Sequence, residues 1–302
     1  MIGIWVTGLF VGGLLVGSFL NVVILRYDPE GSLFSFGRLG GRSRCRKCGQ
    51  ELGFLELVPV FSFLFLKGKC RNCKDSISIQ YPIVELLSGI IFVAIPLFLN
   101  KFYGVFNVAF FEGASEMWYY FLVLSWIAAF LTWLVMGVID LREYIIPDEV
   151  VIGIGFLGIV VGMLTGLNAE AIPAFRGSFL THFSLLFPAI TNIFLNRLVA
   201  VALAGVIFYS MYALSRGRAM GFGDVKLALV SGLLFGWPDI LLVVILSFVL
   251  GGMFGLISII RRKKTMKDML PFAPFFVGGC ALVFFFGQSI VELYFKIFSF
   301  TP

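Results

Sequence analysis

The stretch from residue 118 to residue 139 reads WYYFLVLSWIAAFLTWLVMGVI, and residue 140 is an aspartate. It contains no charged side chain, and about 20 mostly apolar residues are enough to cross a bilayer. Six further segments meet or approach this length: 4–25, 81–99, 149–167, 195–215, 239–260 and 274–297. An eighth, 225–237, is shorter. The sequence therefore predicts an all-α polytopic membrane protein with about eight transmembrane helices.

The composition and charge distribution agree with a lipid bilayer as the solvent. Apolar residues make up 60% of the chain and charged residues only 13%, against about 25% charged residues in soluble domains. Of the 23 lysines and arginines, 19 fall in four alternate loops: 26–80, 140–148, 214–226 and 261–270. Basic loops stay on the cytoplasmic side, so we expect these loops there and the N-terminus outside. Topology thus explains the net charge of +6, and we expect no nucleic-acid partner.

Two matched cysteine pairs lie in the loop between the first two spans. They are Cys45-x-x-Cys48 and Cys70-x-x-Cys73. Two CxxC turns at this separation can place four thiolates at the corners of a tetrahedron, the geometry that Zn²⁺ takes. The alternatives are disulfides, which are rare in the cytoplasm, and free thiols. The spacing favours a structural zinc site that folds a small polar loop.

Two aspartates lie where predicted spans meet the cytoplasmic side. Asp140 ends the third span, and Asp224 follows Gly221-Phe-Gly at the start of the short segment. Two carboxylates that share one water can act as base and acid on a peptide bond. A structural role as a helix cap or ion-pair partner accounts for Asp140 and Asp224 as well as a catalytic role does, when only the local sequence is considered. For Asp148 the structural role is the favoured interpretation. If the two do form a pair, the helix dipole predicts a lowered pKa for Asp224, which would leave the shared proton on Asp140.

The sequence argues against a histidine-dependent enzyme and against a transporter. The only histidine, His182, falls in an outer loop and is interpreted as a surface residue, which excludes mechanisms that need a catalytic histidine. A non-enzymatic transporter or assembly scaffold is the alternative to an enzyme. Transporters tend to contain repeats and ionisable residues near the bilayer midplane, whereas no repeat is evident here.

Over nearly its whole length the chain resembles the prepilin peptidases. The segments that carry this resemblance occur in the family's order: GSFLNVVILR (17–26), the two CxxC pairs, YPIVE (81–85), the Asp140 segment up to Asp148, GFGDVKL (221–227) and LPFAPF (270–275). A GxGD sequence alone is a weak signal, but this ordered set is specific. One departure is Ala273, which stands where the family usually has glycine.

The resemblance implies a GxGD-type aspartic protease of the bacterial inner membrane, with its active site and zinc loop on the cytoplasmic side. Its substrates are type IV prepilins and the pseudopilins of type II secretion, whose basic leader is cleaved after a glycine and before, usually, a phenylalanine. Full-length members then methylate the new α-amino group with S-adenosylmethionine. The matching positions make Asp140 and Asp224 the catalytic pair and the four cysteines the zinc ligands.

The resemblance also implies roles for single residues and for parts of the chain. Gly68 and Lys69 match a segment that the family associates with methyl transfer. We expect a first transmembrane helix (1–25), a cytoplasmic zinc-binding loop domain (26–80) and a transmembrane protease core (81–302). A protease without methyltransferase activity is the alternative within the family.

Overall fold

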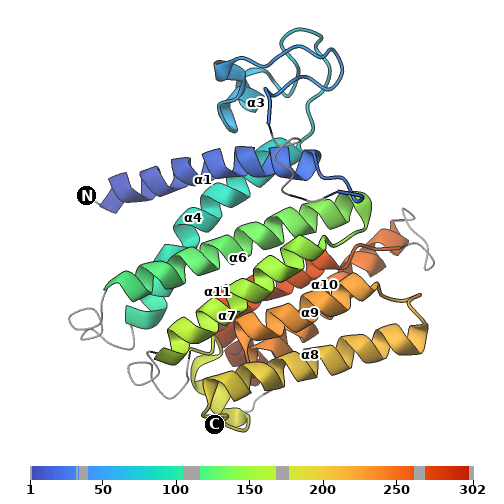
Figure 1. Ribbon diagram of the computed structural model, residues 1–302. Coiled ribbons are helices and arrows are strands. Elements are labelled where there is room, and N and C mark those ends of the chain that lie inside the picture. The colour runs from blue at the N-terminus through green and yellow to red at the C-terminus, as the bar shows by residue number, and fades with distance from the viewer. Residues whose placement is uncertain are drawn as a thin grey trace. The chain divides into compact units, whose positions relative to one another are not determined.

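The computed structural model describes residues 2–31, 33, 40–104, 116–167, 177–261 and 269–298. The described elements are α-helices and two short 3-10 helices (Figure 1). Their bounds are α1 Ile2–Leu25, η1 Phe54–Glu56, α3 Phe61–Phe65, α4 Gln80–Gly104, α6 Glu116–Glu143, α7 Asp148–Leu167, η2 Thr181–Leu186, α8 Ile193–Ser215, α9 Phe222–Phe235, α10 Asp239–Ile260 and α11 Ala273–Ile297.

Within the described residues, seven helices are long and apolar enough to cross a membrane: α1, α4, α6, α7, α8, α10 and α11. The predicted all-α membrane fold is therefore confirmed. The eighth predicted segment, 225–237, corresponds to α9, which has 14 residues. At 1.5 Å per residue α9 is about 21 Å long, shorter than the hydrocarbon core of about 30 Å. It also begins earlier than predicted, so that Asp224 lies inside its first turn.

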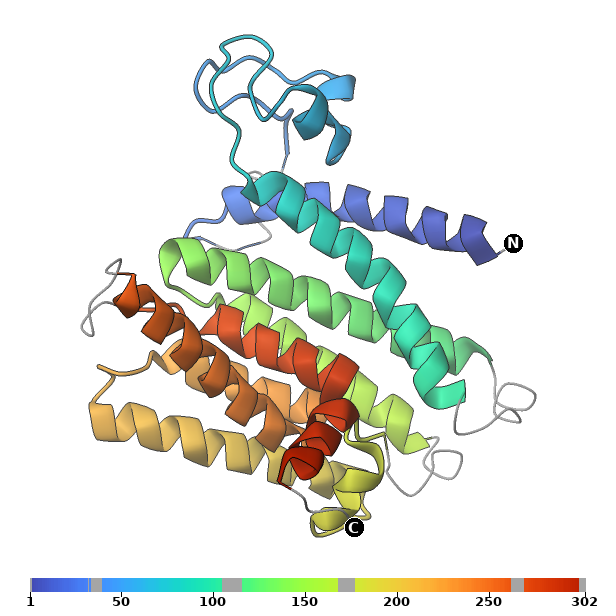
Figure 2. The ribbon, with the colours of Figure 1, turned by 180° about the vertical axis from the view of Figure 1, so that it is seen from behind.

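The chain divides into two compact units, residues 1–100 and 101–302, with the boundary inside α4. In the first unit, α1 and α4 cross closely at small residues (Figures 1 and 2). A Cβ atom at Gly13 would lie 2.8 Å from the Cα of Gly89, and one at Gly17 would lie 2.7 Å from the Cα of Glu85. Such contacts stabilise helix pairs in lipid, where burial of apolar surface gives no driving force.

In the second unit, the short helix α9 packs mainly against α8 and α7 (Figure 1). Glycines allow this close packing on both sides. A Cβ atom at Gly232 of α9 would lie 2.9 Å from the backbone of Val201 in α8. One at Gly158 of α7 would lie 2.8 Å from the Cβ of Leu233 in α9. Helix α9 is therefore packed closely between its neighbours inside the bundle.

Candidate active site and metal centre

Asp140 lies near the C-terminal end of α6 and is only 5% exposed. Its Oδ2 accepts a hydrogen bond of 3.1 Å from the backbone N–H of Ala273, the first residue of α11. The first N–H groups of a helix have no partner within the helix, and the helix dipole favours a negative charge beside them. The start of α11 therefore holds the Asp140 carboxylate in place. Nothing in the local sequence predicts this contact, although Ala273 belongs to the LPFAPF segment (270–275).

Asp224 is the third residue of α9 and is partly buried. Its Oδ2 accepts the backbone N–H of Gly221 at 3.2 Å, the N-terminal capping arrangement expected of an acidic side chain at this position. A Cβ atom at Gly223 would lie 3.2 Å from the Cβ of Ile146, so this glycine allows the turn after α6 to pack against α9. Gly223 lies within the first turn of α9, and Gly221 is the N-cap residue before it.

The two carboxylates come from helices far apart in the chain, yet they interact electrostatically. The pKa of Asp224 is raised to about 7: burial contributes most, the negative charge of Asp140 adds to it, and the Gly221 N–H opposes it with a smaller effect. A nearby like charge disfavours ionisation in this way. The expectation of a lowered pKa for Asp224 at a helix start is therefore wrong, because burial and Asp140 outweigh the favourable helix terminus.

An ion pair closes the turn between α6 and α7 onto α9. Lys226 Nζ lies 2.7 Å from Asp148 Oδ1 and 5.4 Å from the centre of the Phe222 ring. Asp148 is the first residue of α7, so this pair joins the start of α7 to the first turn of α9. The structural interpretation of Asp148 is supported, and Lys226 forms its ion pair with Asp148 rather than with Asp224.

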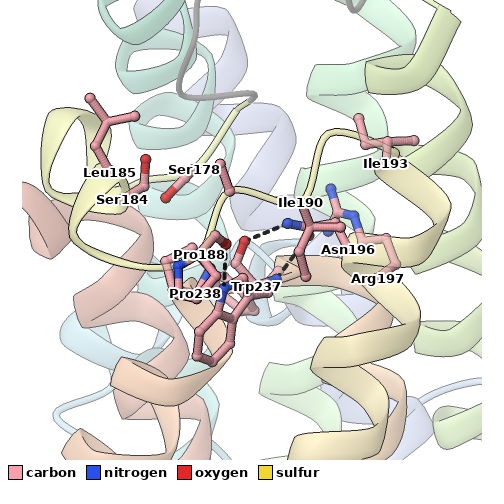
Figure 3. Close-up of a pocket in the computed structure, with 12 residues that line it drawn as sticks. Ser178, Ser184, Leu185, Pro188, Ile190, Ile193, Asn196, Arg197, Trp237 and Pro238 are labelled. Carbon is pink, nitrogen blue, oxygen red and sulfur yellow. Dashed lines mark hydrogen bonds between the residues drawn. The ribbon is translucent and has the colours of Figure 1, made fainter.

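The pocket drawn in Figure 3 lies at the other end of α9 and does not contain the aspartates. There Asn196 of α8 accepts the N–H of Trp237 at 2.9 Å and donates to its carbonyl at 2.7 Å. The neighbouring Arg197 donates to the carbonyl of Leu233 at 3.0 Å and also to that of Leu234. These side chains satisfy carbonyls that end α9 and connect it to α8.

The four cysteines of the loop converge. The Sγ atoms of Cys45, Cys48, Cys70 and Cys73 all lie within 4.8 Å of one another, and none forms a disulfide. Cys45 Sγ and Cys73 Sγ are 3.8 Å apart. A tetrahedral centre with Zn–S bonds of about 2.3 Å has S–S edges of about 3.8 Å. Backbone N–H groups of Cys48 and Lys47 lower the pKa of Cys45 to about 6. Against the opposing N–H of Asp75, burial and the other three thiols raise the pKa of Cys73 to about 11, so Cys45 is the more readily ionised of these two thiols.

The two CxxC halves repeat one backbone pattern. In each half the first cysteine donates its N–H to the carbonyl five residues later, at 2.9 Å for Cys45 and 2.8 Å for Cys70. Its own carbonyl accepts the N–H four residues later, at 3.0 Å in both halves. That donor residue has a positive φ in both: 72° at Gly49 and 58° at Lys74. The backbone thus presents two equivalent pairs of thiols, and the cluster has the geometry to hold one metal ion.

Gly68 and Lys69 lie between α3 and the second cysteine pair. The N–H of Gly68 donates to the carbonyl of Phe63 at 2.8 Å, and the N–H of Lys67 donates to the carbonyl of Leu64 at 3.0 Å. These are the two hydrogen bonds of a Schellman cap at the end of α3. Both cap residues have positive φ, 66° at Gly68 and 52° at Lys67. This cap explains the glycine structurally, and the predicted role in methyl transfer stays a prediction.

Comparisons with known proteins divide the chain at a similar place. Residues 11–99 match the family described as Bacterial Peptidase A24 N-terminal domain, and residues 126–256 match the Type IV leader peptidase family. A prepilin leader peptidase/N-methyltransferase of Xanthomonas campestris is 30% identical over 307 residues, covering 94% of this chain and 92% of the relative. Proteins of the same name from Pseudomonas aeruginosa and Aeromonas salmonicida are 27% and 28% identical, covering 95% and 94% of this chain and 92% of each relative. No solved structure matches the chain.

Proposed function

The chain belongs to the type IV leader peptidase family, and we propose that Asp140 and Asp224 are its catalytic pair. The reaction is cleavage of the prepilin leader followed by N-methylation of the new N-terminus. The observation that carries the residue assignment is the electrostatic coupling of two carboxylates from α6 and α9. Each aspartate also accepts one backbone N–H through a single oxygen, which leaves its second oxygen for water and substrate.

The raised pKa of Asp224 favours its carrying the shared proton while Asp140 is ionised. Asp140 then takes a proton from the water as the water oxygen bonds to the scissile carbonyl carbon. Asp224 gives its proton to the carbonyl oxygen. As this tetrahedral intermediate collapses, the C–N bond breaks, Asp140 gives its proton to the leaving amine, and Asp224 takes a proton back from one hydroxyl of the intermediate. The two groups titrate as a pair, so the pH dependence of the rate reports the pair.

The substrates in this proposal are prepilins or pseudopilins, cut between glycine and phenylalanine at the cytoplasmic membrane boundary. The seven apolar helices make the chain a multi-pass membrane protein. We place it in the bacterial inner membrane, with the cysteine loop and both aspartates on the cytoplasmic side. The concentration of 19 of the 23 basic residues in four alternate loops supports this orientation.

The four cysteines are proposed to hold one structural Zn²⁺. Their sulfur spacing fits a tetrahedral centre, and the metal would supply folding free energy to a loop with little core of its own. S-adenosylmethionine is proposed as the methyl donor, with Gly68 and Lys69 in the methyl-transfer part of the chain. We propose that residues 26–80 act as the zinc-binding loop domain and residues 81–302 as the protease core.

The test is incubation of the purified protein with a prepilin and isotopically labelled S-adenosylmethionine, followed by mass spectrometry. We expect a shortened, N-methylated product from the wild type and no shortened product from Asp140→Asn or Asp224→Asn. Wild-type cleavage by either variant would remove that aspartate from the pair. A cleaved, unmethylated product would identify a protease alone, and an unchanged substrate would favour a non-enzymatic role.

A further inference from the structure

The first unit contains a buried carboxylate that the proteolytic mechanism does not use. Glu85, in the second turn of α4, is 6% exposed. Of the acidic residues that the structure describes in residues 1–100, it is the one that is buried. No ion pair joins it to a basic side chain among the described residues. A carboxylate inside a membrane helix without a cation is costly, and such residues usually have a function.

The polar side chains near Glu85 come from α1 and from one face of α4, and two of their oxygens lack a hydrogen-bond partner. The Ser18 hydroxyl of α1 hydrogen-bonds to its carboxylate. Asn21 Oδ1 and Ser88 Oγ are buried and have no hydrogen-bond partner, while Asn21 Nδ2 donates to the Tyr81 carbonyl at 3.1 Å. Residues 81, 85 and 88 share one face of α4 because they are three to four residues apart. We call Ser18, Asn21, Glu85 and Ser88 the Glu85 seam.

In the resting structure a strained backbone turn covers this carboxylate. Glu85 Oε2 accepts the N–H of Val60 at 2.7 Å. Val60 has φ 63° and ψ −51°, and the N–H of Phe61 bonds back to the carbonyl of Pro59 at 2.6 Å. This is a γ-turn with positive φ, which is rare and strained for a β-branched residue. Strain of this kind clusters at ligand sites, and breaking the Val60–Glu85 bond would release it.

From these observations we infer that the Glu85 seam binds the α-amino group of the cleaved substrate for methyl transfer. The inference rests on the proposed function. The methyl acceptor is an ammonium at the end of an apolar helix, so it needs an anionic partner at the membrane edge. An ammonium has three N–H donors and no acceptor, which suits a seam that contains a carboxylate and two buried oxygens without a hydrogen-bond partner. One N–H of the ammonium takes the place of the Val60 N–H as the donor to Glu85 Oε2.

Glu85 accepts one proton from the ammonium, and the neutral nitrogen attacks the methyl carbon of a sulfonium donor. The N–C bond forms as the C–S bond breaks, and the electron pair of the C–S bond stays on sulfur. The methylated nitrogen leaves as an ammonium, and Glu85 returns its proton to solvent.

The test uses a peptide that begins with a free phenylalanine amine and continues as the mature membrane segment. It is given with S-adenosylmethionine to full-length wild type and to Glu85→Gln. Glutamine keeps an oxygen for the Val60 N–H but lacks the charge, so a purely structural role predicts wild-type methylation. We expect methylation to fall about 30-fold or more, the scale of losing a buried partner of a charged group. Leader cleavage and bound zinc should be unchanged.

Glu56→Gln is the matched control, because Glu56 also accepts a backbone N–H, that of Gly53, at 2.7 Å, but in an exposed bond. It should methylate normally. Binding without a donor gives a second readout: wild type should bind the free-amine peptide more tightly than its N-acetylated form, and Glu85→Gln should bind both alike. Normal methylation by Glu85→Gln, or loss of zinc or cleavage with it, would overturn the inference. If the wild type itself fails to methylate, the proposed methyltransferase function fails instead.

Discussion

Replacing Asp224 by asparagine should stabilise the folded protein at high pH while removing its activity. Asp224 has its pKa raised from 3.8 to about 7, so the folded state holds a proton that the unfolded chain releases at lower pH. Wild-type stability therefore falls as the pH rises from about 4 to about 7, at about 1.4 kcal/mol per pH unit. Between pH 5 and pH 8 this cost grows by about 2 to 3 kcal/mol, and Asp224→Asn does not incur it.

The assay is unfolding of the purified protein in detergent at pH 5 and pH 8, comparing wild type with variant at each pH. Contributions from groups that do not interact with Asp224 cancel in this difference, and at pH 8 the difference in stability should favour the variant. Loss of the repulsion between Asp224 and Asp140 is part of this effect. Asp148→Asn is the control, because Asp148 is exposed and forms an ion pair with Lys226. It should gain no stability at pH 8. If the difference between Asp224→Asn and wild type is equal at both pH values, Asp224 is not held in the environment described here.

Three further predictions concern the rest of the chain. Leader cleavage should decline as the pH rises through about 7, because the pair loses the proton that Asp224 carries, and Asp140→Asn should abolish cleavage at every pH. Cys48→Ser should release the metal, measured by elemental analysis, and should reduce methyl transfer at least as much as cleavage. Asn196→Ala removes two hydrogen bonds to Trp237 and should cost about 1 to 3 kcal/mol of stability, with slower cleavage. Unchanged unfolding and cleavage would show that Asn196 does not support α9.

Most of the fold was predictable because the bilayer imposes its requirement on each segment separately. A run such as 118–139 has to be a helix in lipid, where every backbone polar group must be satisfied within the segment. The cysteine cluster was predictable for a similar local reason, since each CxxC turn places its two thiols from a few neighbouring residues. The ends of helix α9 were harder to predict, because this helix has only 14 residues and depends on contacts with α7 and α8.

What the sequence by itself determined is therefore the set of membrane helices, the cysteine pairs and the two candidate aspartates. Only the tertiary structure decided that Asp140 takes its hydrogen bond from Ala273 and that its charge raises the pKa of Asp224. It also revealed the strained turn at Val60 held by Glu85. The physical reason is range: hydropathy and turn spacing act over a few residues, whereas burial and coupling of charges depend on helices that meet only after the whole bundle packs.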